Sequence, residues 1–207
     1  MGFVAVVDYG MGNIDSVRRA FEVAGATVVV TGDPDDLADA DRIVLPGVGA
    51  FGVAMANLRR SGLDAALTEQ VVGQGSPFLG ICLGMQLMAT SGSEHGDHEG
   101  LGWVDATVDR MAPTPSDPRV PHVGWNEVHP VRDHPVLEGI EADRDFYFVH
   151  SFAVRCADDG DRLATTPYGG GFTSAIARGS AVGVQFHPEK SQGVGQALIR
   201  AFLAWDG

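Results

Sequence analysis

The sequence lacks long hydrophobic runs and carries little positive charge, and both shortages exclude classes of protein. Its apolar stretches, such as residues 3–7 and 43–45, have the length of a strand, far short of the roughly 20 residues that span a bilayer. Lysine and arginine together number 14, against 27 aspartates and glutamates, so the formal net charge is -13. This charge repels phosphate, so we expect no nucleic-acid binding and no attachment to an anionic membrane.

Cysteine is also scarce, with Cys82 and Cys156 as the two examples. The N-terminus runs directly into an apolar stretch, without a basic flank or a small-residue cleavage site, so we expect no secretory signal and a cytoplasmic location. In that compartment both cysteines are expected to be free thiols. The length of 207 residues suits one sizeable core, which predicts a single domain over residues 1–207.

The acidic residues gather in two runs, residues 32–41 and 157–161. We interpret both runs as solvated surface that aids solubility. A docking face for a basic partner is the alternative interpretation.

Strand and helix signals alternate in the first half of the chain. Asn13 is the expected N-cap of the first helix and Gly25 its stop. Predicted strands cover residues 3–7, 27–31, 42–45 and 77–81, and predicted helices cover 14–25, a stretch ending near 60, and 63–72. This alternation predicts a parallel sheet with helices on both faces and a ligand site at the carboxyl ends of its strands.

The second half is different, because strand-like runs follow one another closely. They lie at residues 103–109, 124–131, 145–154, 172–177 and 181–186, and they predict an antiparallel extension of the sheet. Residues 194–205 predict a final amphipathic helix, and the proline-rich residues 112–121 predict an exposed loop. The predicted fold class is α/β, with a central, mostly parallel sheet flanked by helices and extended by antiparallel strands.

The segment GICLGMQL, residues 80–87, places Cys82 between two glycines. This is the form of a nucleophile elbow, in which glycines relieve the crowding around a strained nucleophile. A helix starting after Cys82 would direct N–H groups toward the sulfur and favour the thiolate. A buried structural cysteine in a strand-to-helix turn is the alternative until a base is found.

The expected base is His187, in the segment GVQFHPEKS. The predicted strand ends at His187, Pro188 cannot extend it, and Glu189 lies two residues on. We therefore expect the imidazole and the carboxylate to project to the same side of an extended chain. Glu189 would fix the tautomer of the ring and support the imidazolium.

The other histidines lack this arrangement. We interpret His122, His129 and His134, in predicted loops or turns, as hydrogen-bonded structural residues. His150 lies in a predicted strand without an acidic neighbour at the same spacing. The segment HGDH, residues 95–98, resembles a metal pair but has no third ligand, so we interpret it as solvated surface and expect no metal site.

Two glycine-rich loops follow predicted strands. LPGVGAFG, residues 45–52, can point its N–H groups into a cleft and hold a phosphate or an oxyanion. It lacks the lysine and hydroxyl residue of a P-loop, and DYGMGN, residues 8–13, has two of the three dinucleotide-binding glycines. A tight strand-to-helix turn is the alternative for each loop. We discount nucleotide binding at both and expect no cofactor.

The cysteine elbow and the FHPE segment together resemble the class I (triad) glutamine amidotransferase family. Within it, the chain resembles the glutaminase subunits of imidazole glycerol phosphate synthases in histidine biosynthesis. The segments that carry this narrower likeness are DYGMGN, LPGVGAF, GICLGMQL, PHVGWN, FYFVHSF and GVQFHPEKSQ, and the likeness runs over residues 7–202. Val123 stands where methionine is usual, which is a volume-similar exchange. Residues 91–100 are more polar than is typical and stay unassigned.

The resemblance implies a fold of the flavodoxin-like amidotransferase type and a glutaminase reaction. Cys82 would attack the side-chain carboxamide of L-glutamine, and His187, held by Glu189, would act first as acid and then as base. By the same resemblance, the oxyanion and substrate sites would comprise Gly47, Val48, Gly49, Leu83, Gln86, His150, Ser151 and Phe152.

The resemblance also implies a partner. The ammonia would pass to a cyclase subunit, a (β/α)8 barrel that forms a heterodimer with this chain. The partner interface would include Asn13, Trp125, Tyr147 and Lys190, although a plain surface lysine is the alternative for Lys190. Two other functions remain open: a glutaminase serving another synthase, of the anthranilate, aminodeoxychorismate or pyridoxal phosphate type, and a non-catalytic docking subunit. The intact Cys82, His187 and Glu189 argue against the last.

Overall fold

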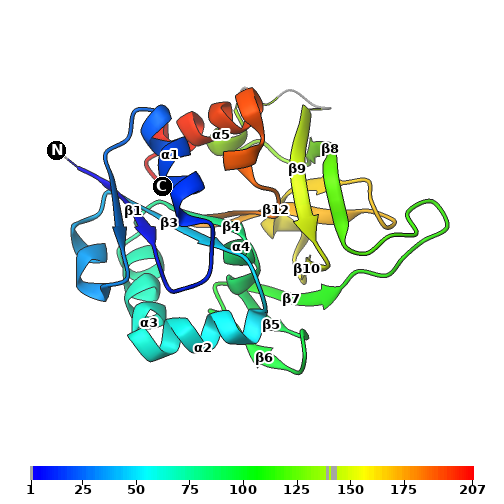
Figure 1. Ribbon diagram of the computed structural model, residues 1–207, viewed down its shortest axis with the longest axis horizontal. Coiled ribbons are helices and arrows are strands. Elements are labelled where there is room, and N and C mark those ends of the chain that lie inside the picture. Colours follow the sequence, from blue (N-terminus) through cyan, green and yellow to red (C-terminus); the bar gives the residue numbers. More distant parts are fainter. Residues whose placement is uncertain (1, 139, 141–143) are drawn as a thin grey trace.

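A mixed β-sheet runs through the centre of the protein (Figure 1). The computed structural model describes residues 2–138, 140 and 144–207. Ten strands lie side by side in the order β2 (Val28–Thr31), β1 (Val4–Val7), β3 (Arg42–Gly47), β4 (Phe78–Cys82), β13 (Ala181–Val184), β12 (Phe172–Arg178), β10 (Phe152–Cys156), β7 (Val104–Arg110), β5 (Ala89–Gly92) and β6 (His98–Glu99). A branch leaves β12 through β11 (Arg162–Thr166), β8 (His122–Pro130) and β9 (Arg144–His150).

The strand directions confirm the predicted division of the sheet. Strands β2, β1, β3, β4 and β13 are parallel, whereas β12, β10 and the β11–β8–β9 branch pair antiparallel. Each residue of β1 is buried and apolar, which suits a strand covered on both faces. The parallel register places Gly47 of β3 beside Cys82 of β4. The glycine loop after β3 and the cysteine turn after β4 therefore begin next to each other.

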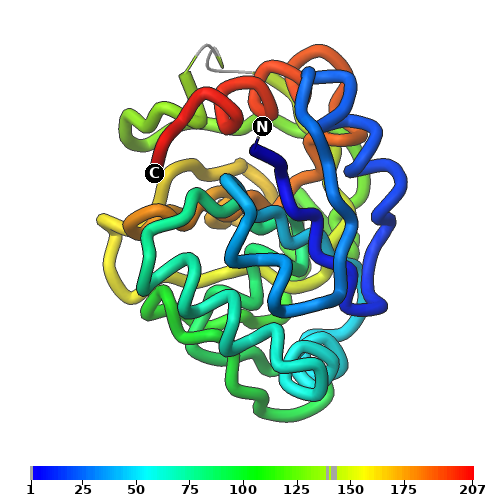
Figure 2. The backbone as a smooth tube through the Cα atoms, turned by 90° about the vertical axis from the view of Figure 1, so that its left-hand side faces the viewer, coloured from blue at the N-terminus to red at the C-terminus, as the bar shows by residue number. Residues whose placement is uncertain are grey.

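Helices cover both faces of the sheet, as predicted. Helices α1 (Ile14–Val23) and α5 (Gln192–Ala204) lie together on one face, and α2 (Phe51–Ser61) and α3 (Leu63–Thr68) lie on the other, as Figures 1 and 2 both show. Each face has its own apolar core: Phe21 meets Phe202 on the first and Phe78 meets Trp103 on the second. A fully buried phenylalanine contributes about 1.5–3 kcal/mol through its apolar surface.

Helix α1 forms because its apolar residues recur at helical spacing and its ends are marked. Val17, Ala20 and Phe21 face the core, and Gly25 follows the helix with φ 98°. Asn13 occupies the N-cap position as predicted, but its side chain makes no capping hydrogen bond.

The predicted helical stretch 63–72 is present as α3 followed directly by a π-helical turn, η2 (Glu69–Gly73). Several other predicted boundaries are wrong. The run 145–154 is divided into β9 and β10 at Ser151, and β13 ends at Val184. His122 and His129 lie within β8 and not in loops. Strands β5, β6 and β11 were not predicted. Short 3-10 turns cover η1 (Pro34–Asp39), η3 (Pro135–Leu137), η4 (Asp159–Asp161) and η5 (Pro188–Lys190).

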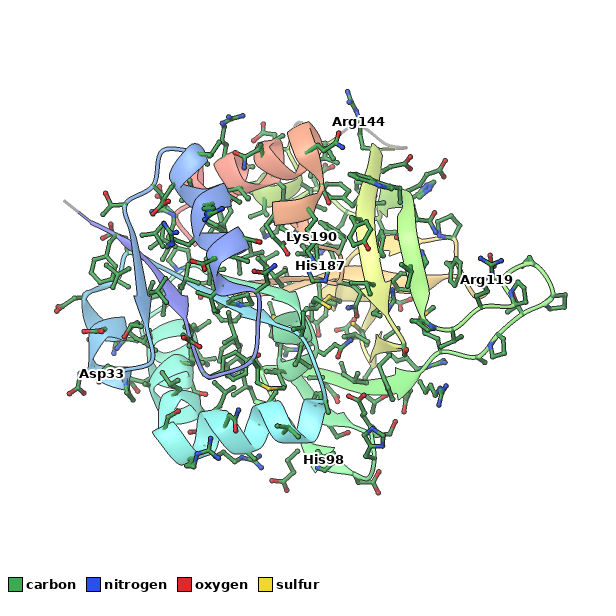
Figure 3. All side chains as sticks on the ribbon, viewed as in Figure 1. Asp33, His98, Arg119, Arg144, His187 and Lys190 are labelled. Atoms are coloured by element: carbon green, nitrogen blue, oxygen red, sulfur yellow. The ribbon has the colours of Figure 1, made fainter. Side chains whose placement is uncertain are left out.

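The proline-rich stretch forms the predicted loop between β7 and β8 and projects from the body of the protein (Figure 1). Figure 3 shows Arg119 on this loop, at a distance from His187. Over the described part of the chain, we find no helix with the length and hydropathy required to cross a membrane.

Candidate active site

Cys82 sits in a strained turn between β4 and the short helix α4 (Leu83–Leu87). Its backbone has φ 53° and ψ −104°, a conformation that side-chain-bearing residues rarely adopt and that costs about 1–3 kcal/mol. The flanking glycines are required by close approach. A Cβ on Gly84 would collide with the carbonyl oxygen of Leu45, and one on Gly80 would lie 2.7 Å from the carbonyl of Gly84. The geometry is that of the predicted elbow.

The elbow opens into a cavity of ≈ 440 Å³. Seven of the eight residues expected to hold the oxyanion and the substrate line this cavity: Val48, Gly49, Leu83, Gln86, His150, Ser151 and Phe152. Ala50, Glu94, Pro121 and Val149 complete the lining together with Cys82. Gly47 does not line the cavity. It is the last residue of β3, where a Cβ would collide with the hydroxyl of Tyr9.

His187 and Glu189 form a buried pair. The Nδ1 atom of His187 lies 2.8 Å from Oε1 of Glu189, and the side chains are 3% and 2% exposed. The backbone conformation predicted for this segment is wrong. The strand ends at Val184, and residues 188–190 form the 3-10 turn η5 rather than an extended chain. The turn nevertheless brings the carboxylate onto the ring and fixes its orientation.

The environment of His187 favours its charged form. Burial opposes protonation, but the interactions with Cys82 and Glu189 outweigh it and raise the pKa of His187 to about 9. The ring is then an acid at neutral pH. Within the described part of the structure, Nε2 of His187 has no hydrogen-bond partner of ordinary geometry. His187 therefore interacts with Cys82 electrostatically, without a hydrogen bond of ordinary geometry between them.

Gln185 is hydrogen-bonded to the Cys82 sulfur. Its Nε2 donates to Sγ at 3.5 Å, and its Oε1 accepts from Nε2 of Gln86 at 3.0 Å. Gln185 is fully buried. Sequence reasoning missed it, although a glutamine inside the apolar run AVGVQF is a recognisable signal, because a buried amide must be hydrogen-bonded.

Glu94 is a second residue that sequence reasoning missed. Its Oε2 accepts the backbone N–H of Phe51 at 2.9 Å, so it caps helix α2 directly after the glycine loop. Among the described residues that line the cavity, Glu94 is the one with a charged side chain. It lies in the stretch 91–100, which the sequence left unassigned and which has no local signal for such a role.

The elbow, the cavity and the His187–Glu189 pair agree with the comparison with known families. The glutamine amidotransferase class-I family model matches residues 5–205. The chain belongs to the class I glutamine amidotransferase family.

Relatives of full length carry a more specific name. Imidazole glycerol phosphate synthase subunit HisH 2 of Nitrobacter winogradskyi is 46% identical over 211 residues, with 100% of both chains covered. Subunit HisH of Rhodopseudomonas palustris is 48% identical, with 98% of each covered. Among solved structures, one described as a glutamine amidotransferase has a TM-score of 0.76 at 21% identity, with 98% of each chain covered. That likeness shows the fold.

Three of the four residues expected at a partner interface of this amidotransferase lie together. The Trp125 and Tyr147 rings are 6.0 Å apart, and Nζ of Lys190 lies 5.8 Å from the centre of the Tyr147 ring. Figure 3 shows Lys190 next to His187. Asn13 is exposed at the start of α1, which packs against the turn η5.

His129 and His134 of the amidotransferase are hydrogen-bonded, as predicted. His129 pairs with Glu127 at 3.0 Å, and His134 accepts the N–H of Val136 at 3.2 Å. His98 contacts the carbonyl oxygen of Glu94 at 3.0 Å through Nε2, while His95 is exposed. The described residues contain no group of three or more histidine, cysteine, aspartate or glutamate side chains suited to a metal ion. Both cysteines are free.

Proposed function

We propose that this chain is the glutaminase subunit of an imidazole glycerol phosphate synthase. It hydrolyses L-glutamine to glutamate and ammonia and passes the ammonia to a cyclase subunit in histidine biosynthesis. The observation that carries the glutaminase assignment is the strained Cys82, open to a cavity and electrostatically coupled to the buried His187–Glu189 pair. The likeness to HisH subunits, at 44% to 48% identity over nearly the whole chain, supports the place in histidine biosynthesis.

In the first half of the reaction, Sγ of Cys82 attacks the side-chain carbonyl carbon of glutamine. The carbonyl oxygen becomes an oxyanion, held by the backbone N–H of Leu83 and by an N–H of the loop at Val48 and Gly49. Each such donor contributes about a hundredfold or more to the rate. The imidazolium of His187 gives its Nε2 proton to the departing nitrogen, the C–N bond breaks, and ammonia leaves behind a glutamyl thioester.

In the second half, neutral His187 takes a proton from water, and the hydroxide oxygen attacks the thioester carbon. The C–S bond breaks and releases glutamate and the Cys82 thiolate. Glu189 supports the imidazolium in both halves, because its carboxylate stays hydrogen-bonded to Nδ1 at 2.8 Å.

Two side chains in the cavity match the polar groups of glutamine. Glu94 supplies a carboxylate for the α-ammonium group. Gln86 donates its two amide hydrogens to Phe152 O at 3.1 Å and to Gln185 Oε1 at 3.0 Å. Its carbonyl oxygen is left to accept a hydrogen bond from the substrate. Removing either group leaves a polar part of glutamine unpaired in the site.

The proposed partner is a cyclase with a (β/α)8 barrel, in a cytoplasmic heterodimer with this single-domain chain. Exposed apolar side chains support a docking surface that contains Trp125 (47% exposed), Val123 (57%) and Val48 (43%). Val48 belongs to the oxyanion loop, so a partner on this surface would contact the loop whose N–H groups complete the site. We place Asn13, Tyr147 and Lys190 in the same interface.

The test is glutamate production by the isolated chain and by its mixture with the cyclase and the cyclase's nucleotide substrate. We expect stimulation by the mixture, and a loss of at least about a thousandfold in Cys82→Ala. Cys156→Ala is the matched control, because burial and nearby aspartates raise the pKa of Cys156 to about 11 and keep it protonated. Unchanged turnover with the cyclase would exclude the histidine pathway, and no turnover in any mixture would exclude a glutaminase.

A further inference from the structure

A series of hydrogen bonds runs from Asn126 on β8 to the carbonyl of Phe152 at the cavity. Asn126 donates from Nδ2 to Nε2 of His122 at 3.2 Å. Nδ1 of His122 lies 3.0 Å from Nε2 of His150, and Nδ1 of His150 lies 2.9 Å from the carbonyl oxygen of Phe152. The two rings meet because His122 and His150 stand opposite each other in the β8–β9 register.

The two ends of this series fix the proton positions on both rings. A carbonyl oxygen only accepts, so His150 must carry its proton on Nδ1. Asn126 accepts the N–H of Glu127 through Oδ1 at 2.9 Å, so its Nδ2 faces His122 as a donor. Nε2 of His122 is therefore unprotonated, and its Nδ1–H donates to the free Nε2 of His150. A proton added to either ring would place two hydrogen-bond donors opposite each other, and that hydrogen bond would be lost.

The same carbonyl connects the histidines to the nucleophile. Phe152 O also accepts from Gln86, whose second amide hydrogen goes to Gln185, and Gln185 donates to Sγ of Cys82. An unbroken series of hydrogen bonds thus joins Asn126 to the Cys82 sulfur, and three of its members, His150, Gln86 and Phe152, line the glutamine cavity as well.

Packing holds the two rings in place. His122 is 3% exposed and His150 is 6% exposed. The His122 ring stacks on Tyr168, with centroids 3.9 Å apart, and on Phe148 at 4.9 Å. Burial lowers the pKa of His122 to about 4 and that of His150 to about 3. Both rings therefore stay neutral at physiological pH, as the series of hydrogen bonds requires.

We propose that His122 and His150 are positioning residues for the glutaminase reaction. Both rings, locked as Nδ1–H tautomers, hold the Phe152 carbonyl and the Gln86 amide where glutamine binds. The inference rests on the proposed function and deepens it, since Asn126 follows Trp125 on β8. Hydrogen bonds through the two histidines therefore connect β8, the strand that would contact the partner, to residues that line the substrate cavity.

Two substitutions of His122 separate positioning from packing. His122→Asn keeps a donor at the place of Nδ1 but loses the ring that stacks on Tyr168. His122→Phe keeps the stacked ring but leaves Nε2 of His150 buried without a donor. We expect kcat/KM for glutamine, measured with the cyclase present, to fall about tenfold in His122→Phe, the factor that corresponds to about 1.4 kcal/mol. His122→Asn should stay within about threefold of the wild type.

The reverse order, with the phenylalanine variant more active than the asparagine variant, would show that His122 only packs and would overturn the inference. Equal, unimpaired activity of both variants would overturn it as well. Lack of turnover by the wild type in the same assay would instead refute the proposed function.

A second measurement does not depend on folding of the variants. The ring nitrogen shifts of ¹⁵N-labelled wild-type protein at pH 7 report which nitrogens carry protons. We expect protonated Nδ1 and bare Nε2 on both His122 and His150. A proton on Nε2 of either ring would break the series and refute the proposal.

Discussion

The carbonyl oxygen of Tyr147 accepts the backbone N–H of His187 at 2.9 Å. Ser191 ties the same two residues a second time, since its Oγ accepts the N–H of Tyr147 at 3.0 Å and donates to the carbonyl of His187 at 2.6 Å. His187 is therefore attached to β9, the strand whose Tyr147 ring lies against Trp125 and Lys190. Under the proposed function, a partner that contacts Tyr147 therefore contacts a residue whose backbone is hydrogen-bonded to the catalytic base, His187.

Replacing Glu189 with glutamine removes the negative charge beside His187. We expect Glu189→Gln to lower glutamine turnover about tenfold or more and to lower the pKa of His187 from about 9. The raised pKa means that the protonated His187 ring stabilises the folded state, fully below pH 6.5 and no longer once the pH has risen through about 9. The variant should therefore lose more stability at pH 6 than at pH 9.5. Glutamate release, an NMR titration of His187 and urea unfolding measure the three effects.

The chain offers a matched control for this substitution. Glu127 also pairs with a histidine, with Oε2 3.0 Å from Nε2 of His129, but at the partly exposed surface. Glu127→Gln should leave turnover unchanged. Equal losses in both variants would mean that the Glu189 carboxylate has no special role.

The His122–His150 pair predicts a loss of stability in acid. The unfolded chain binds protons at about pH 6.5, whereas the folded pKa values are about 4 and 3. The unfolded state thus takes up more protons, and the free energy of unfolding falls as the pH drops below 6.5, by up to about 1.4 kcal/mol per pH unit for each histidine. Urea unfolding at pH 7, 6 and 5 should show a shallower decline in His122→Phe. Parallel declines would contradict the prediction.

Tyr9 carries a buried hydroxyl that makes no hydrogen bond within the described part of the structure. Burial and the nearby Cys82 raise its pKa, so the hydroxyl keeps its proton. Because an unpaired buried polar group is costly, Tyr9→Phe should stabilise the fold by about 1 kcal/mol. Tyr168→Phe is the control, since its hydroxyl donates to Arg119 O at 2.8 Å and its loss should be neutral or mildly destabilising. A lower midpoint of urea unfolding for Tyr9→Phe would mean that the hydroxyl has a partner.

Two glycine-to-alanine changes should have opposite effects. Gly84→Ala places a methyl group against the Leu45 carbonyl at the elbow, and we expect a loss of about 3 kcal/mol or more. Gly193 is exposed in the first turn of α5 with no atom near its added Cβ, so Gly193→Ala should stabilise by about 0.5 kcal/mol. Thermal unfolding of both variants measures the two effects. An unchanged unfolding temperature for Gly84→Ala would contradict the close approach of the backbone at Gly84 to the Leu45 carbonyl.

The elbow and the His187–Glu189 pair were predictable because short segments encode them. Glycines on both sides of Cys82 reveal a turn that is too crowded for other residues, and a carboxylate two residues after a histidine stays within reach whether the chain is extended or turned. The predicted strands of the first half likewise depended on local patterns, such as the continuous apolar run of residues 4–7.

The other parts of the site depend on long-range pairing, which local patterns do not encode. His122 meets His150 because β8 and β9 adopt one register out of several, and a shift of one residue would place the two rings on opposite faces of the sheet. Glu94 reaches the cavity through the small β5–β6 unit, whose four-residue and two-residue strands lack a period-two pattern. Gln185 alone had a local signal, as an amide in the apolar run AVGVQF.

Lys190 stands three residues from His187, exposed and over the Tyr147 ring, and it is the one lysine among the 207 residues. Amine-directed reagents therefore have a single side-chain target in this protein, apart from the N-terminal amine. A fluorophore or a short crosslinker attached there would report from the proposed docking surface without any engineered residue, and its shielding by an added cyclase would be measurable on the natural sequence.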